Sequence, residues 1–379
     1  MKVKDRHIFQ YRLLRKCFAP LFKHIFRYDC EEVNCPEGPT IILANHVTDF
    51  DPALVAISFS RHMYFVASEH VYRLRLVSGI LRYLVAPIAR IKGRRDARTV
   101  AEVFRALKGG SNVCIFAEGN RTFNGLTCNI LESTGKMVYK SGANLITYKL
   151  EGGYLTQPRW AAQLRPGRMR GYVVGMYSAE ELHAMTADEV NTLIVRDLQE
   201  DAYARQTENP VPYTCKALAE HIEIAAYICP NCKKIGTIKS HRNTFSCACG
   251  LNGKYTEFGF LEGNFPFITI AQWDAWQVEE LACIIKMSGE QPIHENVDQT
   301  LYIVEPGVGN RKLVNGTLRI YKNKLCFEDY TFEFSEISDM AIYGRMTLVF
   351  SNKQGNQYEI KSAYPRSACI YYQIYLLMR

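Results

Sequence analysis

His46 and Asp51 are the two residues whose types and spacing best suit chemistry. They stand five positions apart, Asn45 precedes the histidine, and an apolar run at 41–44 comes directly before them. A histidine that leaves a buried strand and a carboxylate on the first turn of the next helix can turn towards each other, so that the carboxylate fixes the imidazole tautomer and stabilises the imidazolium. The spacing predicts that His46 converts a hydroxyl into a nucleophile. Taken alone, the pair could also be a histidine satisfied near a helix cap.

A second polar loop, at residues 117–122, also follows an apolar run, at 113–117. Loops at strand ends are where α/β sheets present ligands. Gly119 would let the backbone approach a ligand closely, and Arg121 offers a planar fork for a phosphate. Glu118 could hold a ligand hydroxyl or the arginine itself. In isolation, these residues could equally form a surface turn with a local ion pair.

A cationic cluster at residues 90–96 lies between these two loops and contains Arg90, Lys92, Arg94 and Arg95. A phosphate pocket needs such cations from a second segment. The alternative interpretation is the solvated start of a basic helix. The cluster gains weight only in combination with the two loops.

Together, the three segments resemble the glycerolipid acyltransferase family, which includes the 1-acylglycerol-3-phosphate acyltransferases. The family's blocks run in the same order: Asn-His-x4-Asp, a Gly-and-Arg block, Phe-Pro-Glu-Gly-Thr-Arg-Ser and a proline-containing apolar strand. The first block matches fully. The matching positions are Asn45, His46, Asp51, Phe116, Glu118, Gly119 and Arg121.

The chain also departs from the family's pattern. Ala117, Asn120 and Thr122 differ from the third block, and residues 142–150 lack the prolines of the fourth. Either Arg94 or Arg95 takes the arginine position of the second block. The resemblance covers roughly residues 30 to 180, in the order in which the family's blocks occur.

The resemblance implies a membrane-associated O-acyltransferase of phospholipid biosynthesis. His46 would be the general base, Asp51 its support, and lysophosphatidate the acceptor, with acyl-coenzyme A or acyl carrier protein as the acyl donor. Another lysophospholipid or a lyso-amino-acid lipid is the alternative acceptor. Attack on a thioester develops an oxyanion that nearby amides or cations can stabilise. The residues expected to hold the glycerol phosphate are Arg94, Arg95, Glu118, Gly119 and Arg121.

These residues need a sheet to position them, and the pattern from residue 40 onwards supplies one. Apolar runs at 41–44, 64–67, 113–117 and 145–150 alternate with helical segments, which predicts an α/β fold with a central sheet flanked by helices. A small zinc ribbon and a β-rich C-terminal domain are expected to follow.

Four of the thirteen cysteines form two tight pairs, Cys229 with Cys232 and Cys247 with Cys249. Thiolate pairs on turns are what a tetrahedral zinc requires, so the spacing predicts a structural zinc ribbon rather than four coincidental thiols. Four protein ligands leave no open position for catalysis. The nearby cations could bind nucleic acid, but nothing else in the sequence supports that partner.

Residues 8–27 predict a basic amphipathic helix, with one apolar arc opposite a cationic one. Its functional interpretation is an anchor in an anionic membrane surface, and the alternative is a helix that covers the protein's own core. Pro20 is expected to kink or split it. The apolar arc is Leu14, Phe18, Leu21, Phe22 and Ile25; the cationic arc is Arg12, Arg15, Lys16, Lys23 and Arg27.

The net charge of +8 favours anionic partners. Because the start lacks a secretory signal and no run spans a bilayer, we expect a peripheral protein on the cytoplasmic face of a membrane. An alternative of another functional class is a non-catalytic scaffold that binds a membrane or nucleic acid. The intact His46 and Asp51 argue against it.

The predicted domains follow from these segments. They are 1–28, the membrane-interface helix; 29–208, the acyltransferase domain; 209–262, the zinc ribbon, entered through a helix at 215–226; 263–300, a connector with a helix; and 301–379, a small β-rich domain. Six short β-like runs and a closing helix make the last of these resemble a pleckstrin-homology or related lipid-binding module.

Overall fold

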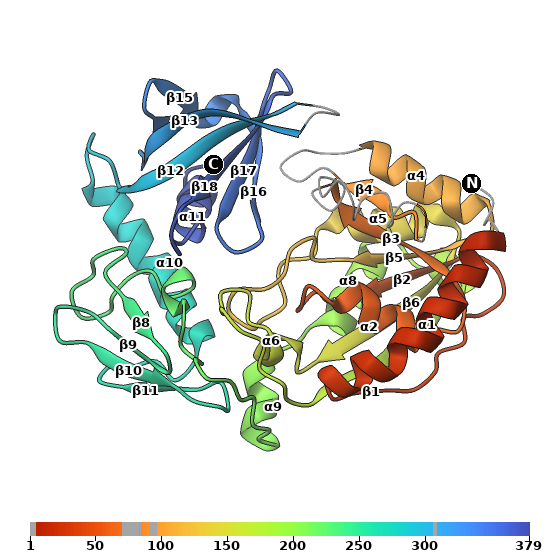
Figure 1. Ribbon diagram of the computed structural model, residues 1–379. Helices are drawn as coiled ribbons and strands as arrows, with labels where there is room; N and C mark the ends of the chain where they lie inside the picture. Colours follow the sequence, from red (N-terminus) through yellow and green to blue (C-terminus); the bar gives the residue numbers. More distant parts are fainter. Residues whose placement is uncertain (1–4, 70–82, 84, 91–96, 306–308) are drawn as a thin grey trace. The chain divides into compact units, whose positions relative to one another are not determined.

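The computed structural model describes residues 5–69, 83, 85–90, 97–305 and 309–379 (Figure 1). The chain folds as two compact units, the first formed mainly by residues up to Cys215 and the second mainly by residues from Lys216 onwards, which also includes residues 160–163. No helix within the described ranges is long and apolar enough to cross a membrane.

A seven-stranded sheet forms the centre of the first unit, with the strand order β1-β7-β6-β2-β5-β3-β4. The central strand β2 pairs in parallel with both β5 and β6, whereas β7 runs antiparallel to β6. The strands are β1 (Tyr28–Cys30), β2 (Thr40–Ala44), β3 (Met63–Ser68), β4 (Ile88–Arg90), β5 (Asn112–Phe116), β6 (Asn144–Glu151) and β7 (Met169–Tyr177). The four predicted strands are confirmed as β2, β3, β5 and β6.

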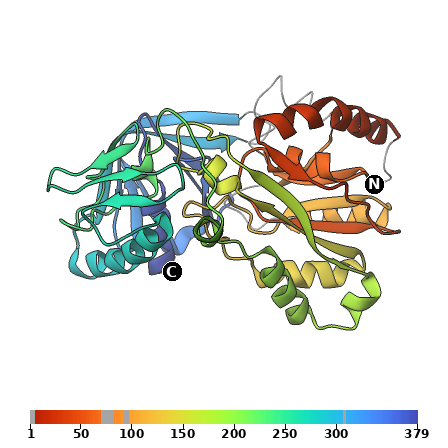
Figure 2. The ribbon, with the colours of Figure 1, turned by 90° about the horizontal axis from the view of Figure 1, so that it is seen from below.

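Helices cover both faces of this sheet (Figures 1 and 2), because successive strand residues point to opposite sides. Ile42 and Ala44 of β2 pack in one apolar cluster with residues of α1 and α2. Ile41 and Leu43 pack in the other, with residues of α4, α5 and α8. The helices are α1 (Asp5–Ile25), α2 (Asp51–Ser58), α4 (Ala97–Lys108), α5 (Glu132–Ser141), α6 (Gly153–Thr156), α7 (Ala179–His183), α8 (Ala187–Leu198) and α9 (Ala202–Glu208). The predicted α/β architecture is therefore confirmed.

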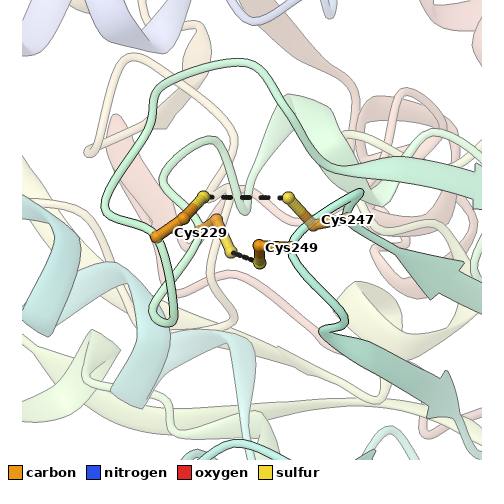
Figure 3. Close-up of side chains that lie close together, drawn as sticks. Cys229, Cys247 and Cys249 are labelled. Atoms are coloured by element: carbon orange, nitrogen blue, oxygen red, sulfur yellow. Dashed lines mark hydrogen bonds between the residues drawn. The ribbon is translucent and has the colours of Figure 1, made fainter.

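The second unit begins with a small antiparallel sheet in the order β11-β10-β9-β8. Cys229, Cys247 and Cys249 point towards a common centre on turns beside this sheet (Figure 3). Helix α10 packs against it through the buried Trp273, whose indole nitrogen donates to the Ile228 carbonyl at 2.9 Å. The elements are η2 (Ile222–Ile224), β8 (Lys239–His241), β9 (Thr244–Ser246), β10 (Asn252–Tyr255), β11 (Leu261–Gly263) and α10 (Ile270–Met287).

A seven-stranded antiparallel sheet and one helix complete the second unit. The strand order is β15-β14-β13-β12-β18-β17-β16, so the first strand of this sheet pairs with its last. The elements are β12 (His294–Glu305), β13 (Gly309–Ile320), β14 (Lys324–Phe327), β15 (Tyr330–Glu333), η3 (Phe334–Glu336), β16 (Ile337–Tyr343), β17 (Thr347–Asn352), β18 (Gln357–Ser362) and α11 (Cys369–Met378). The predicted β-rich C-terminal domain is confirmed, and β16 is an additional strand that was not predicted.

Two local predictions differ from the structure. The segment 215–226 was expected to be helical, but only η2 forms a short 3-10 turn there, because His221 takes a left-handed φ of 71° that ends regular helix. Helix α1 continues through Pro20 as a single element, so the predicted split does not occur, while the alternative, a kink at Pro20, stays a prediction.

Candidate active site and metal-binding cluster

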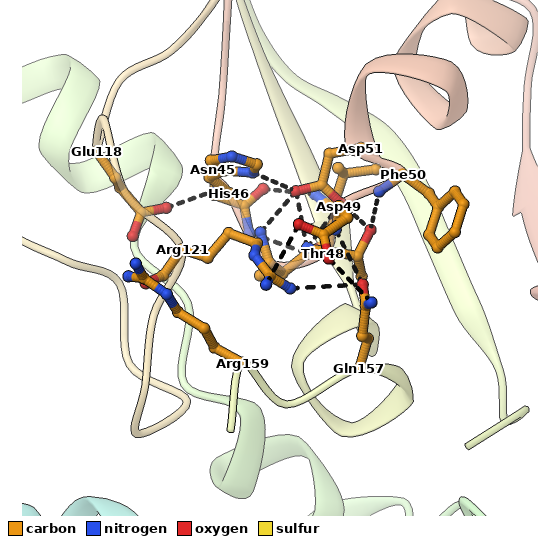
Figure 4. Close-up of polar contacts among 12 residues, drawn as sticks. Asn45, His46, Thr48, Asp49, Phe50, Asp51, Glu118, Arg121, Gln157 and Arg159 are labelled. Carbon is orange, nitrogen blue, oxygen red and sulfur yellow. Dashed lines mark hydrogen bonds and ion pairs between the residues drawn. The ribbon is translucent and has the colours of Figure 1, made fainter. Parts of the chain in front are cut away.

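His46 and Asp51 meet at the carboxyl end of β2, where the chain turns into α2 (Figure 4). The His46 Nδ1 lies 2.7 Å from the Asp51 Oδ2. The Asp51 side chain is fully buried, whereas 22% of the His46 side chain is exposed. Because a carboxylate can only accept, Nδ1 carries the proton and Nε2 is left as the basic nitrogen.

Asp51 is held in place by the loop that it closes. Its two oxygens accept hydrogen bonds from the Val47 amide at 2.6 Å, the Thr48 amide at 2.9 and 3.0 Å, and the Thr48 hydroxyl at 2.6 Å. Every oxygen of the carboxylate is therefore used by residues 46–48. This geometry fixes the orientation of the imidazole before any substrate binds.

The neighbours of His46 come from strands on both sides of β2. Its ring stacks on Phe116 at the end of β5, with ring centroids 4.5 Å apart. The Asn45 side chain accepts from the Leu150 amide at 2.7 Å and donates to the Leu150 carbonyl at 2.9 Å, which joins the loop to β6. Asn45 thus positions the start of the loop, a role that the motif match alone did not assign.

The Glu118 carboxylate accepts hydrogen bonds from backbone amides and not from the Arg121 guanidinium. Its oxygens accept from the His46 amide at 2.7 Å and from the Cys128 amide at 2.5 Å. Burial raises the pKa of Glu118 to about 7, although these two amides oppose the shift. The carboxyl therefore ties the His46 backbone to the loop after β5.

Arg121 is almost completely buried and is paired with Asp49. Its Nη2 lies 3.3 Å from the Asp49 Oδ1, and its Nη1 donates to the Gln157 Oε1 at 3.4 Å. Arg159 donates to the Arg121 carbonyl at 2.8 Å. Asp49 and Gln157 were not among the predicted site residues. Asp49 could have been found because it stands inside the His46 motif.

Gly119 has a left-handed φ of 65°, and a Cβ built on it would lie 2.6 Å from a guanidinium nitrogen of Arg90. The absence of a side chain therefore lets Arg90, at the end of β4, lie directly against this loop. Arg90 is the described cation of the predicted basic cluster. The predicted substrate-binding residues Arg94 and Arg95 lie outside the described residues.

The ligand atoms of Cys229, Cys232, Cys247 and Cys249 all lie within 4.8 Å of one another. The Cys229 and Cys249 sulfurs are 3.5 Å apart, and those of Cys232 and Cys247 are 3.8 Å apart. A tetrahedral zinc with Zn–S bonds of about 2.3 Å requires sulfur separations of about 3.8 Å. The four cysteines fit a metal ion such as zinc.

The surroundings of the sulfurs shift the pKa values of two of these thiols in opposite directions. Burial raises the pKa of Cys229 to about 12, a cost that a bound cation would offset. At Cys247 burial also opposes ionisation, but the Cys249 amide and the Thr237 hydroxyl lower the pKa of the thiol to about 6. The Thr237 Oγ1 lies 3.3 Å from the Cys247 Sγ, where it can orient a ligand sulfur.

Residues 27–151 match the family model described as Acyltransferase, which confirms the family resemblance for this part of the chain. The match includes His46, Asp51, Glu118 and Arg121 and ends before the four cysteines. No curated protein matches the sequence.

Two solved structures are similar to parts of the chain. One is the 1-acyl-sn-glycerophosphate (LPA) acyltransferase PlsC from Thermotoga maritima, at 20% identity and a TM-score of 0.41, covering 50% of this chain and 78% of that one. The other is the C-terminal domain of an unknown protein from Leishmania infantum, at 16% identity and a TM-score of 0.18, covering 24% of this chain and 87% of that one.

Proposed function

Because residues 27–151 carry a domain of the Acyltransferase family, we propose that this chain transfers a fatty acyl group from acyl-coenzyme A or acyl carrier protein to a hydroxyl of lysophosphatidate. The observation that carries this proposal is the 2.7 Å contact between His46 and the buried Asp51. A partly exposed base on a fully buried carboxylate suits proton abstraction from a hydroxyl that arrives from outside.

The proposed reaction uses this pair as a base and its support. His46 Nε2 takes the proton of the acceptor hydroxyl while its oxygen attacks the thioester carbonyl. The resulting oxyanion collapses, the carbon–sulfur bond breaks, and the departing thiolate takes the proton back from the imidazolium. Asp51 stabilises the imidazolium between these two steps. An ester and a free thiol are the products.

The acceptor phosphate is proposed to bind at the loop that follows β5. Arg121 and Arg90 supply positive charge from two segments of the chain, and Arg94 and Arg95 remain candidates for the same role. Gly119 lets the Arg90 guanidinium lie close to this loop. Glu118, whose oxygens both accept backbone amides, contributes by holding the loops rather than by contacting the ligand.

A panel of lysophospholipids with labelled acyl-coenzyme A or acyl carrier protein tests this function. We expect a diacyl product, and we expect His46→Ala to lower its rate by about 10²- to 10⁴-fold, the usual contribution of a general base. His183→Ala, which removes an exposed histidine from α7, is the matched control. An unchanged rate in His46→Ala would remove the proposed base.

Helix α1 is proposed to hold the protein on an anionic membrane surface. His7, Gln10 and Tyr11 face the protein, and Phe22 stacks on Phe26. Part of the predicted apolar arc therefore packs against the protein itself. The apolar residues that α1 leaves exposed are Phe9, Leu13, Phe18, Leu21 and Ile25, accompanied by exposed Arg12, Lys16 and Lys23.

Liposome flotation tests the anchor. Replacing the exposed Leu13 and Leu21 by glutamate should release the protein from vesicles that contain anionic lipid, because it removes apolar area and adds repulsion. Deleting residues 1–28 would be less informative, since it also removes the core residue Phe26. The matched control is Val195→Glu, an exposed apolar residue on α8. Undiminished binding of the double variant would place the membrane contact elsewhere.

The four cysteines are proposed to bind one structural zinc. Metal analysis of freshly isolated protein should find about one zinc per chain, as a single tetrahedral four-sulfur site requires. A chain without metal would contradict this assignment.

A further inference from the structure

Asp49 places a negative charge beside the arginine that we assign to the acceptor phosphate. Its Oδ1 lies 3.3 Å from the Arg121 Nη2, and its Oδ2 accepts a hydrogen bond from the side-chain Nε2 of Gln157 at 3.1 Å (Figure 4). The Asp49 side chain is 61% exposed, whereas that of Arg121 is 8% exposed. The carboxylate is therefore the part of this ion pair that faces solvent and an arriving ligand.

Gln157 makes the pair a fixed arrangement. It directly follows α6, and its side-chain oxygen accepts from both the Asp49 backbone amide at 2.9 Å and the Arg121 guanidinium at 3.4 Å. One side-chain amide thus binds the backbone of Asp49, its carboxylate and the guanidinium. Rotation of Asp49 away from Arg121 would break the hydrogen bond between the Asp49 carboxylate and Gln157.

Arg121 is also fixed from its backbone. Its carbonyl accepts from Arg159, whose guanidinium stacks on the Phe123 ring at 4.1 Å. A buried guanidinium needs a partner charge, and Asp49 supplies one at 3.3 Å. A phosphate bound to Arg121 would therefore also lie close to the Asp49 carboxylate.

We propose that Asp49 narrows the preference of this site for a phosphate monoester such as lysophosphatidate, so that a lysophospholipid whose phosphodiester headgroup ends in an ammonium is accepted as well. A monoester carries about 1.5 to 2 negative charges at neutral pH, and Asp49 repels that charge. A zwitterionic headgroup presents one negative charge to the arginine and an ammonium to Asp49. This inference rests on the proposed function, since it takes Arg121 as a phosphate contact.

Asp49→Asn tests the proposal, because asparagine keeps the shape and a hydrogen-bonding oxygen but loses the charge. The kinetic constants are measured with lysophosphatidate and with a lysophospholipid that carries an ethanolamine headgroup. The ratio of kcat/KM for the monoester to that for the zwitterion should rise by up to about fivefold, the range of an exposed ion pair. The change should appear mainly in KM, because Asp49 pairs with Arg121, whereas the proposed base His46 pairs with Asp51.

Two further variants make the result specific. Asp49→Glu keeps the charge and should retain the wild-type ratio. Asp188→Asn removes the same charge from the start of α8, where it is exposed. The preceding helix α7 bonds to Asn144, which pairs with Thr40 at the start of β2, the end opposite to His46. Asp188→Asn should leave the ratio unchanged.

A ratio that stays constant in Asp49→Asn, or that falls because KM for the monoester rises, would overturn the proposal. The second outcome would make Asp49 a support for Arg121 rather than a filter. A ratio that moves equally in Asp188→Asn would also overturn it, since net charge alone would then explain the effect.

Binding of inorganic phosphate separates this inference from the proposed function. Calorimetry should show tighter phosphate binding by Asp49→Asn than by the wild type, and weaker binding by Arg121→Gln. If no lysophospholipid is acylated by any variant, the proposed function fails while the phosphate measurement still decides the role of Asp49. Equal phosphate affinities of wild type and Asp49→Asn would contradict that role.

Discussion

The His46–Asp51 pair and the four-cysteine cluster are both built from residues that lie close together in the sequence, but they differ in what they leave open. Around His46, the hydrogen-bonding capacity of Asp51 is used by its own loop, while the imidazole edge remains partly exposed. Around the cysteines, four sulfurs lie within 4.8 Å of one another, close enough to share one metal ion. The first site presents a reactive atom to a ligand, whereas in the second the ligand atoms face one another.

This difference shows how a polar cluster can be assigned a chemical or a structural role. A site that performs chemistry needs a rigid interior and an accessible reactive group. A structural metal site needs all of its ligands satisfied by one ion. Four changes test the contrast, from the largest expected effect to the smallest.

Removing the metal should have the largest effect. A strong chelator should unfold the segment around the cysteines, because a structural zinc contributes about 10–16 kcal/mol of apparent folding free energy in small zinc modules. Melting curves with and without chelator would measure it. Cys249→Ser should act in the same direction, whereas Cys283→Ser, at an exposed cysteine of α10, should not. Loss of acyl transfer without any change in melting would mean that the metal acts in the chemistry.

Asp51→Asn should have the next largest effect. The asparagine side chain has one NH₂ group in place of an accepting oxygen, and this group would face the N–H and O–H donors of Val47 and Thr48. The imidazole therefore loses the acceptor that orients it, and the loop is destabilised. We expect the transfer rate to fall by about 10²- to 10⁴-fold and the free energy of unfolding to fall by about 1–3 kcal/mol. Rate measurements and thermal melting report the two effects separately. A rate close to that of the wild type would show that His46 does not depend on the Asp51 carboxylate.

Glu118→Gln should change the pH dependence of stability. The folded pKa of about 7 lies above the ordinary value of 4.5, so the folded state retains a proton that the unfolded state releases. The contribution of Glu118 is present below pH about 4.5 and is lost as the pH rises towards 7. The variant should lack this slope, which denaturant titrations at several pH values would show. Glu180→Gln on α7 serves as the control, and parallel slopes in wild type and Glu118→Gln would contradict the assignment.

Thr237→Val should have the smallest effect. Its hydroxyl contacts the Cys247 sulfur but is not a ligand, so its loss should lower the affinity for zinc by roughly tenfold or more without unfolding the module. Competition with a chromophoric chelator measures the affinity. Thr244→Val, at an exposed threonine of β9 whose hydroxyl donates to the His241 carbonyl, is the matched control. An affinity equal to that of the wild type would remove Thr237 from the metal site.

Short-range features could be predicted from the sequence. The meeting of His46 and Asp51 follows from their spacing at a strand-to-helix turn, and the pairing of Ala44 with Phe116 brings the second loop beside the first. The cysteine spacing likewise predicts the cluster. These features depend on a few residues of chain or on parallel neighbouring strands, which leave little freedom.

Features that depend on tertiary contacts could not be predicted. Gln157 reaches Asp49 from more than a hundred residues away, and no local pattern marks it. The segment 215–226 has a helical pattern, but the Gln277 side chain binds the Tyr227 amide and the Ala225 carbonyl, which satisfies the backbone in another way. Strands β1 and β4 have three residues each, too few to show a periodicity.

The pairing of β12 with β18 has a consequence for synthesis of the chain. Leu301 is opposite Ile360, so one edge of β12 stays without its partner until the ribosome has added the residues between them. At about 5–20 residues per second, that interval lasts several seconds. An unpaired strand edge invites association with other chains. Correct folding of the C-terminal sheet should therefore depend on the translation rate and on chaperones that bind nascent chains.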